Sequence, residues 1–172
     1  MLSPRSALLV LTFLLTVGCD YGTKGLAKAH LEGQNPVELV PGVFALRYAE
    51  NSDTAFSLIG DLMSPAARHV ALSALAGLAT VVLGFALARA WRRLGALQRF
   101  GASMILAGAV GNATERAIRG YVIDFFHVSF WPVFNVADIA IVVGVALFLL
   151  SDWASRRPSR FQSMRAHDAA PF

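Results

Sequence analysis

The sequence predicts an all-α membrane protein with four transmembrane helices and a small extracytoplasmic β-like platform, on three observations. The first is composition: only 15% of the 172 residues are charged and the mean hydropathy is +0.56, whereas an ordinary soluble domain has about 25% charged residues. The second is a set of four apolar runs near the roughly 20 residues that cross a bilayer as a helix. The third is the clustering of basic residues beside those runs, which indicates membrane topology and not nucleic-acid binding.

The four helices belong to one domain, expected at residues 1–152, because the chain is too short for a separate catalytic module. The polar and basic residues 153–172 are expected to form a cytoplasmic tail. The first helix can continue past its apolar run through "DYGTKGLAKAH". Small residues recur in the second and third helices, as expected where helices pack closely in lipid. The transmembrane segments are expected at about 6–20, 66–90, 94–114 and 133–150.

The connection between the first and second helices, residues 30–64, is expected to form the extracytoplasmic platform. Its segment "VELVPGVFALRYA" contains β-branched and aromatic residues in runs that favour strands. Pro41-Gly42 interrupts these runs. We therefore expect a small sheet or an extended segment lying on the membrane.

The arginines orient the helices, because cytoplasmic connections of membrane proteins carry an excess of Lys and Arg. With two arginine clusters and Arg5 in the cytoplasm, both termini lie inside, and residues 30–64 and about 115–131 face outward. One cluster, between the second and third helices, is Arg89, Arg92, Arg93 and Arg99; the other, after the fourth helix, is Arg156, Arg157, Arg160 and Arg165.

The N-terminus admits a second interpretation, because residues 1–19 resemble a secretory signal that ends in Gly18-Cys19, as a lipoprotein signal does. Thr16 stands where such a signal usually has Leu, and a helix-compatible extension follows where a mature lipoprotein usually has a flexible linker. We favour an uncleaved first helix. Cys19 is the only cysteine, which rules out an intramolecular disulfide and any metal site built from several cysteines.

Two aspartates, Asp124 and Asp138, stand in "GYVIDFFHVSFWPVFNVADIA", a stretch otherwise dominated by apolar residues. An ionisable residue in a membrane segment costs roughly 3 kcal/mol or more unless it finds a partner, so it is a functional hypothesis by default. Asp138 lies near the start of the fourth apolar segment, with Asn135 three residues earlier on the same helical face. Asp124 lies in the preceding connection, which can fold back over the start of that helix.

Two carboxylates that meet in a poorly solvated site cannot both ionise easily, so one keeps its proton. The ionised member can then take a proton from an attacking water, while the protonated member polarises a carbonyl or protonates a leaving amine. This is the chemistry of an aspartic peptidase. The structural alternative is that each aspartate caps a helix or pairs with Arg116 or Arg119. The two aspartates together, with Asn135 beside them, favour function.

Four motifs, taken together, resemble the bacterial lipoprotein signal peptidases, the signal peptidase II family. "VIDFF" followed by "WPVFNVADIA" resembles that family's "D-F" and "F-N-x-A-D" signatures. "DYGTK", from Asp20 to Lys24, resembles D-x-x-T-K, and "NSDTAFS", from Asn51, resembles N-x-G-x-A-F-S. "GNATER", from Gly111 to Arg116, resembles G-N-x-x-D-R. The motifs occur in the family's order and cover about residues 7–150.

The resemblance implies a four-helix aspartic peptidase of the bacterial inner membrane, without a cofactor or metal, with its active site at the outer face. Its substrates would be prolipoproteins whose signal-sequence Cys carries diacylglycerol, cut on the N-terminal side of that Cys. Membrane lipids are the other expected partner, and we expect a monomer. The catalytic dyad would be Asp124 and Asp138. The residues implied to support the dyad or bind substrate are Asn51, Asn112, Arg116, Asn135, Asp20 and Lys24.

Three positions depart from the family's pattern: Glu115 replaces a usual Asp, Asp53 stands where the loop motif has Gly, and Ile139 replaces a common Ser. The first two departures admit a second class of function, a catalytically degenerate relative that binds lipid or signal helices without cleaving them. The intact pair of aspartates argues against it. A proton-coupled carrier with Asp138 as a relay is a third alternative, but the second helix offers little polarity beyond Ser73 and Thr80.

Overall fold

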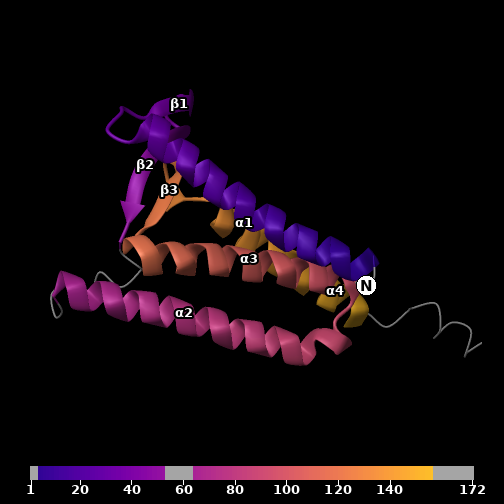
Figure 1. Cartoon of the computed structure of the whole chain (residues 1–172). Helices are drawn as coiled ribbons and strands as arrows, with labels where there is room; N and C mark the ends of the chain where they lie inside the picture. The colour runs from indigo at the N-terminus through magenta and orange to yellow at the C-terminus, as the bar shows by residue number, and fades with distance from the viewer. Residues whose placement is uncertain (1–3, 53–63, 157–172) are drawn as a thin grey trace, which may run out of the picture.

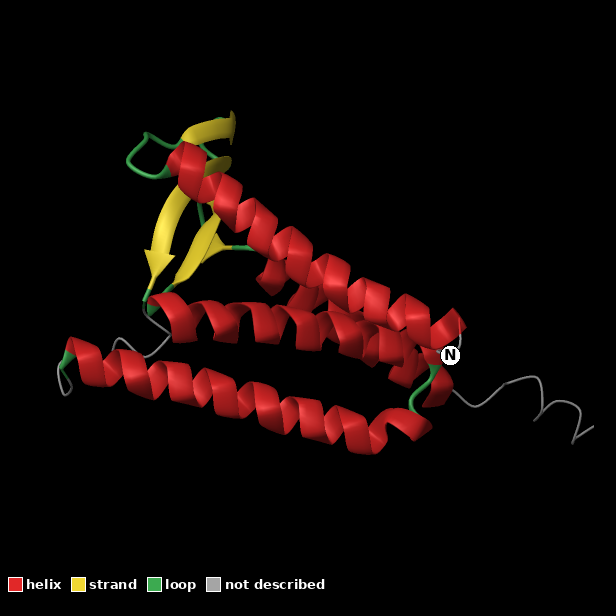
Figure 2. Cartoon of the chain, viewed as in Figure 1, coloured by secondary structure: helices red, strands yellow, loops and turns green. Residues whose placement is uncertain are grey.

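A computed structural model of the chain describes residues 4–52 and 64–156. Asp53 and the end of the predicted tail lie outside the described residues. The described part is mostly helical, with one small sheet (Figures 1 and 2). Its elements are α1 (Pro4–Leu31), β1 (Val37–Val40), β2 (Phe44–Asn51), α2 (Pro65–Ala90), a 3₁₀ turn η2 (Trp91–Arg93), α3 (Ala96–Arg119), β3 (Val122–Val128), β4 (Trp131–Phe134) and α4 (Val136–Arg156).

Local sequence signals explain where the second and third helices begin and end. Ser64 caps α2 by accepting a hydrogen bond from the Ala67 N–H at 3.3 Å, and Pro65 takes the first helical position, where no N–H is needed. At the start of α3 the Gln98 side chain accepts from the Gly95 N–H at 2.8 Å. Helix α3 ends at Gly120, whose φ of 87° is a left-handed conformation that glycine adopts without strain.

Three helices of the described part are long and apolar enough to cross a membrane, within Ser6–Leu31, Val70–Arg93 and Val136–Ser155. Large apolar side chains on them are exposed, as on a surface that faces lipid. Helix α3 contacts all three. Its 24 residues span about 36 Å at 1.5 Å per residue, but polar residues such as Asn112 and Glu115 make it less apolar. The prediction of a mostly helical membrane protein is therefore confirmed, with three apolar spans.

The sheet has four antiparallel strands in the order β1-β2-β3-β4 and lies at one end of the helices (Figure 1). Strands β1 and β2 confirm the strands predicted in "VELVPGVFALRYA" and flank Pro41-Gly42. Strands β3 and β4 were not predicted. The central pairing joins β2 to β3 across more than 70 residues of sequence, with Ala49 opposite Asp124.

Two details of the fold differ from the prediction of a helical protein with a small β-like platform. Residues 122–128, expected in the outward-facing connection, form the third strand of the sheet, so the sheet extends beyond the predicted platform. The fourth helix does not begin at residue 133, because residues 131–134 pair with β3 and α4 begins at Val136. The second difference arises because a short apolar run is compatible with a strand or with a membrane helix until its partners are known.

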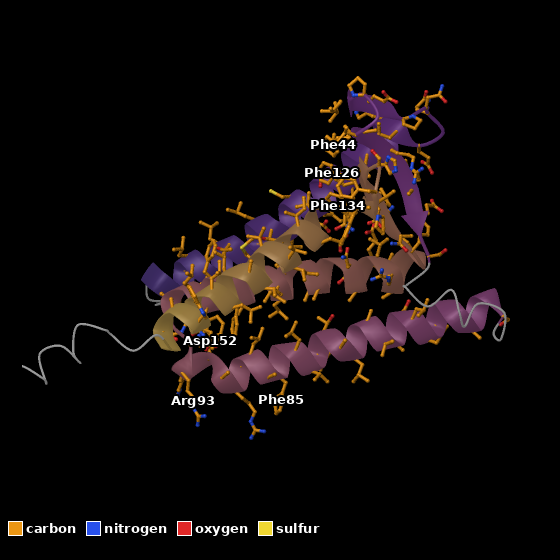
Figure 3. The ribbon with its side chains drawn as sticks, turned by 180° about the vertical axis from the view of Figure 1, so that it is seen from behind. Phe44, Phe85, Arg93, Phe126, Phe134 and Asp152 are labelled. Carbon is orange, nitrogen blue, oxygen red and sulfur yellow. The ribbon has the colours of Figure 1, made fainter. Side chains whose placement is uncertain are left out.

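The sheet is anchored to the helices by apolar packing. Ile123 and Phe125 of β3 are buried against Ala27 near the end of α1. Phe126, which packs against this cluster, also lies near Phe44 and Phe134, with ring centroids 6.1 and 5.6 Å away. Figure 3 shows these three rings gathered at the sheet, at the end opposite Arg93 and Asp152. This packing fixes the strand that carries Asp124.

Helices α3 and α4 approach each other closely through small residues. A Cβ atom on Gly101 would lie 2.5 Å from the carbonyl oxygen of Gly144, and one on Gly144 would lie 2.6 Å from the carbonyl oxygen of Gly101. Gly108 meets the backbone of Ala137 in the same way. Glycine is required for such backbone contact, which is common between membrane helices. The contact at Ala137 places the start of α4 against α3.

Candidate active site

Asp124 is a buried carboxylate near the middle of β3, with 2% of its surface exposed. The Asn51 side chain, at the end of β2, donates a hydrogen bond to its Oδ2 at 2.8 Å. The Asn135 side chain, just before α4, donates to its Oδ1 at 2.6 Å. Each oxygen therefore has an amide donor, which satisfies a polar group between apolar neighbours.

Asp138 lies in the first turn of α4 and exchanges hydrogen bonds with Asn135. The Asn135 N–H donates to Asp138 Oδ2 at 3.1 Å, and the Asp138 N–H donates to Asn135 Oδ1 at 3.0 Å. This reciprocal pattern is a capping box, and it sets the start of the helix. The structural alternative is thus correct in one respect, since Asp138 does take part in a helix cap. The same Asn135 also binds Asp124, so the cap joins the two aspartates.

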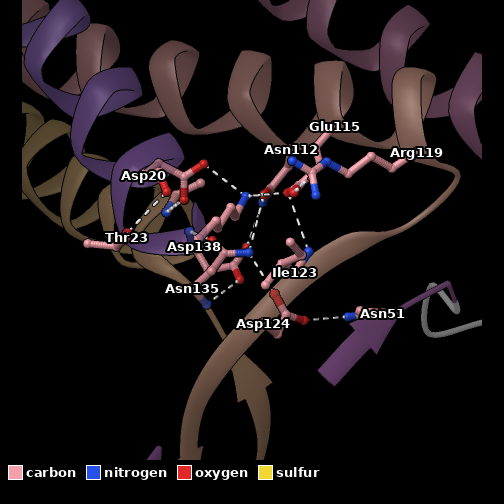
Figure 4. A network of polar contacts seen from close by, with 12 residues as sticks. Asp20, Thr23, Asn51, Asn112, Glu115, Arg119, Ile123, Asp124, Asn135 and Asp138 are labelled. Carbon is pink, nitrogen blue, oxygen red and sulfur yellow. Dashed lines mark hydrogen bonds and ion pairs between the residues drawn. The ribbon is translucent and has the colours of Figure 1, made fainter. Parts of the chain in front are cut away.

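Asn112 of α3 connects Asp138 to α1. Its side-chain nitrogen donates to Asp138 Oδ1 at 2.9 Å. Its Oδ1 accepts from Lys24 Nζ at 2.9 Å and from Asn135 Nδ2 at 3.2 Å. The amide of Asn112 is thereby fixed in one orientation by donors on one side and an acceptor on the other. Figure 4 shows this network between Asn51 and Asp20.

Lys24 is a buried cation, 3% exposed, with three acceptors around its ammonium group. Asp20 Oδ2 lies 2.8 Å from Nζ and Glu115 Oε2 lies 2.9 Å away, in addition to Asn112. The other oxygen of Asp20 accepts from the Ala137 N–H at 2.9 Å, in the first turn of α4. A buried charge requires such partners, and here they tie α1 to α3 and α4.

The environment of Asp124 shifts its acidity. Burial raises the pKa of Asp124 from 3.8 to about 6, and the nearby charge of Asp138 also raises it. The hydrogen bonds from Asn51 and Asn135 and the charge of Lys24 act in the opposite direction and lower this pKa. Asp124 therefore retains a proton at pH values where an ordinary aspartic acid has lost it.

An open apolar pocket adjoins Asp138, and its empty space of about 750 Å³ includes the open solvent at its mouth. Asp138 is the only charged residue that lines it, and the remaining lining comes from the β3–β4 hairpin and the exposed face of α4. A concave apolar site with one polar group is typical of ligand binding. The lining residues are Val128, Phe130, Trp131, Phe134, Asp138, Ile139, Val142 and Val143.

Seven of the eight residues proposed from the sequence meet in one network: Asp20, Lys24, Asn51, Asn112, Asp124, Asn135 and Asp138. Arg116 lies one turn after Asn112, and its carbonyl oxygen accepts from Ser73 Oγ at 3.1 Å. Arg119 approaches Glu115, with Nε 3.7 Å from Oε1. No cluster of three or more His, Cys, Asp and Glu suited to a metal ion occurs within residues 4–52 and 64–156.

Sequence reasoning missed two parts of this network. Glu115 was treated only as a departure from a motif, although an ionisable residue in an apolar helix is itself a signal of function. It is paired with Lys24 and also accepts from the Ile123 N–H at 3.3 Å. The bond from the Ala137 N–H to Asp20 was also missed. No residue pattern signals it, because the donor is a backbone group.

The fold and the site together define a helical membrane protein with two aspartates from different elements, linked by a shared asparagine and enclosed by hydrogen-bond donors. The comparisons with known proteins make the class specific. The family model of signal peptidase (SPase) II matches residues 12–154. This chain belongs to the signal peptidase II family.

Relatives and solved structures agree with this assignment. A lipoprotein signal peptidase of Haemophilus ducreyi is 34% identical over 151 residues, which are 84% of this chain and 89% of the relative. One of Geobacter metallireducens is 35% identical over 153 residues, 87% of this chain and 92% of the relative. A solved bacterial membrane enzyme has a TM-score of 0.71 at 21% identity, over 84% of this chain and 92% of that one. The last likeness concerns the fold.

Proposed function

We propose that this protein is an aspartic endopeptidase that removes signal peptides from diacylglyceryl-modified prolipoproteins, cutting on the N-terminal side of the lipidated Cys. Membership of the signal peptidase II family supports lipoprotein processing. The observation that carries the aspartic mechanism is the shared contact of Asn135 with both Asp124 and Asp138. Two carboxyl groups held to one asparagine can act on one substrate bond.

The two aspartates differ in their surroundings, and this difference supports different roles in the proposed reaction. Asp124 is the more buried, and its raised pKa favours the protonated form. Asp138 is half-buried and lines the open pocket, where water and substrate have access. Asp138 is therefore the general base and Asp124 the general acid. The protonated Asp124 donates a hydrogen bond to the carbonyl oxygen of the scissile peptide.

The reaction then follows in two steps, each with two proton transfers. A water oxygen bonds to the carbonyl carbon while Asp138 takes a water proton and Asp124 gives its proton to the carbonyl oxygen. In the second step the C–N bond breaks, Asp138 gives its proton to the departing nitrogen, and Asp124 takes a proton back from a hydroxyl. The products are the signal peptide with a free carboxyl group and a lipidated Cys with a free amine. Both aspartates end in their starting states.

The pocket beside Asp138 supports a lipidated substrate. It opens on the exposed face of α4, where Ile139, Val142 and Val143 are apolar side chains that lipid would otherwise cover. An acyl chain attached to the Cys next to the scissile bond has a hydrophobic surface to follow there. The signal helix itself is a membrane segment, so its end reaches the membrane boundary close to the sheet.

The membrane arrangement that fits this role has four spans, with α3 as the fourth, both termini in the cytoplasm and the aspartates at the outer face of the inner membrane. Figure 1 supports it, because the start of α1, the α2–α3 connection and the end of α4 lie at one end and the sheet at the other. The α2–α3 connection carries Arg92 and Arg93, as cytoplasmic connections do. Residues 1–152 then form one domain, with 153–172 as a cytoplasmic tail.

Cleavage of a diacylglyceryl-modified prolipoprotein by the purified protein in detergent tests the proposal. Wild type is expected to cut before the lipidated Cys, and mass spectrometry of both products locates the bond. Asp124→Asn and Asp138→Asn are each expected to lower kcat by about 10³-fold or more, because each substitution removes one proton-transfer group. Asp152→Asn, at the end of the molecule opposite Phe126 of the sheet in Figure 3, is the matched control and is expected to retain wild-type activity.

The contrary result is equally clear. A folded wild-type protein that leaves several modified prolipoproteins intact would exclude the peptidase for those substrates and favour a relative that binds without cleaving. Cleavage that persists in Asp124→Asn or Asp138→Asn would retain the peptidase but exclude the dyad.

A further inference from the structure

Glu115 stands between the buried cation of the network and the strand that carries Asp124. Its Oε2 lies 2.9 Å from Lys24 Nζ and also accepts a hydrogen bond from the Ile123 N–H at 3.3 Å. Ile123 is fully buried and directly precedes Asp124. One carboxylate oxygen thus connects α1 and α3 to β3 at the residue next to Asp124 (Figure 4).

Lys24 consequently reaches both aspartates by separate routes. One route runs through Asn112, which accepts from Lys24 and donates to Asp138. The other runs through Glu115 to the backbone that precedes Asp124. Each route consists of charged or amide groups that are almost completely enclosed, and the Glu115 side chain is 10% exposed. Enclosed polar contacts of this kind hold their members in fixed geometry.

We propose that Glu115 is a positioning residue of the peptidase: by binding Lys24 and the Ile123 N–H together, its negative charge fixes Asp124 relative to Asp138. The inference rests on the proposed function, because it concerns the geometry of that reaction. Glu115 touches neither aspartate through a hydrogen bond or ion pair described above, so it acts through Lys24 and the strand. Asp20 already pairs with Lys24, so a neutral residue at 115 leaves the cation compensated.

The charge of Glu115 also has an electrostatic consequence for the site. Lys24 lowers the pKa of Asp124, and Glu115 offsets part of the Lys24 charge. Removing the Glu115 charge strengthens the effect of Lys24 and removes a negative charge near Asp124, and both changes favour the ionised form of Asp124. The charged and titratable groups on the elements around β3 include Asp20, Lys24, Lys28 and His30 of α1, Arg47, Tyr48 and Glu50 of β2, Glu115, Arg116 and Arg119 of α3, and Asp138 of α4.

Two substitutions separate the charge of Glu115 from its length. Glu115→Gln keeps an oxygen for the Ile123 N–H but loses the charge, whereas Glu115→Asp keeps the charge on an arm shorter by one bond, about 1.5 Å. Glu32→Gln is the matched control, because Glu32 also pairs with a lysine of α1 but is exposed, 3.8 Å from Lys28. All variants are purified in detergent and assayed on the modified prolipoprotein for kcat, KM, thermal unfolding and pH profile.

We expect Glu115→Gln to lower kcat about tenfold with little change in KM, and to move the alkaline limb of the kcat/KM profile to lower pH by on the order of half a unit. Glu115→Asp is expected to have its alkaline limb at the wild-type pH, because it keeps the negative charge. Its kcat is expected to be about two- to fivefold lower than that of wild type. Glu32→Gln is expected to match wild type in every measurement. A group that merely stabilised the fold would lower the unfolding temperature without moving the limb.

Three results would overturn the inference. One is a Glu115→Gln variant with wild-type kcat and an unmoved limb. Another is a Glu115→Gln variant whose unfolding temperature and kcat are lowered but whose alkaline limb is unmoved, because this result would show that Glu115 only stabilises the fold. If Glu115→Gln does not fold, a folded Glu115→Asp whose alkaline limb moves to lower pH, although the charge is kept, is decisive against it. Failure of the wild type to cleave would instead contradict the proposed function, so the two failures are distinguishable.

Discussion

Asp124 shows how single residues set the chemistry of this site. Its neighbours in β3, Ile123 and Phe125, are buried and apolar, so the carboxyl group has lost most of its water. Asn51 and Asn135 replace part of that water with two N–H donors. Donors stabilise the ionised form, while burial and Asp138 oppose it. The result is an acid whose pKa of about 6 lies above the ordinary value of 3.8.

The pH profile of the wild type follows from this balance. In the proposed mechanism Asp124 is the general acid and must carry a proton, which it loses as the pH rises through its pKa of about 6. We therefore expect kcat/KM to fall as the pH rises through about 6, since that profile reports the free enzyme. The measurement is initial cleavage rate at low substrate from pH 4.5 to 8.5. A profile that is flat from pH 5 to 8 would exclude Asp124 as the titrating acid.

Substitution of Asn51 tests the same balance in the opposite direction. Asn51 lowers the pKa of Asp124 by donating to its ionised form. Asn51→Ala removes that donor, so the pKa rises and the alkaline limb is expected to move to higher pH by about half a unit or more. At the same time kcat is expected to fall several-fold, because Asp124 loses an orienting contact. Asn35→Ala, on an exposed residue, is the control, and an alkaline limb that moves to lower pH would contradict the assignment.

At the scale of single residues, much of the candidate site could be predicted from the sequence, because its residues are polar and stand in apolar stretches. Asp124, Asn135 and Asp138 stood out as polar residues among apolar ones, and the structure links them through hydrogen bonds. Their roles stay predictions. The contact of Glu115 with the Ile123 N–H was beyond sequence reasoning, because it depends on where α3 ends relative to β3.

Among the elements, the helices were easier to predict than the strands. A run of about 20 apolar residues has few alternatives to a membrane helix, and α2 begins and ends close to the predicted limits. Strands β3 and β4 are short, and their identity depends on pairing with β2, which lies far away in the sequence. Pro132 lies in β4, at the edge of the sheet, where a residue without an N–H is tolerated.

The close packing of α3 on α4 gives a prediction for a residue outside the polar network. A Cβ on Gly108 would overlap the carbonyl oxygen of Ala137 and lie 2.8 Å from Ile141 Cγ1. Gly108→Ala must therefore push the helices apart, at a cost of about 1–3 kcal/mol in stability. The displacement occurs one turn from Asn112 and beside Asp138, so kcat is expected to fall about tenfold as well.

The control for this packing prediction is Gly77→Ala in α2, where an added Cβ meets nothing within 4 Å. It is expected to leave the unfolding temperature in detergent and the cleavage rate unchanged or slightly raised, since alanine favours a helix over glycine. Equal effects of Gly77→Ala and Gly108→Ala would show that the close contact between α3 and α4 is unimportant.

For the whole molecule, the two ends of the helices differ in their charged residues. The polar network and the sheet lie at one end of the helices, and the connection with Arg92 and Arg93 lies at the other (Figures 1 and 3). Between the two ends the helices expose apolar side chains. A bilayer that covers these side chains places the aspartates near one membrane surface and the arginines near the other. On the positive-inside rule we propose that the aspartates lie at the outer surface.

Labelling of single cysteines tests this arrangement and the fourth span together. Cys19 is the only cysteine, so Cys19→Ser provides a background without thiols. Glu38→Cys, Arg92→Cys and Phe130→Cys introduce exposed positions before α2, between α2 and α3, and after α3. A membrane-impermeant maleimide is expected to label positions 38 and 130 in intact spheroplasts and position 92 only after lysis.

Each outcome of the labelling has one meaning, because a crossing helix separates its two flanking positions. Labelling of positions 38 and 92 from the same side would show that α2 does not cross the membrane. Because α2 is long and apolar enough to cross, that result would contradict the proposed membrane arrangement. Labelling of 92 and 130 from the same side would show that α3 does not cross, and the chain would then have three spans. A fully inverted pattern would place Asp124 and Asp138 at the cytoplasmic surface. There they could not meet a cleavage site at the outer end of a signal helix, and the proposed substrate would be excluded.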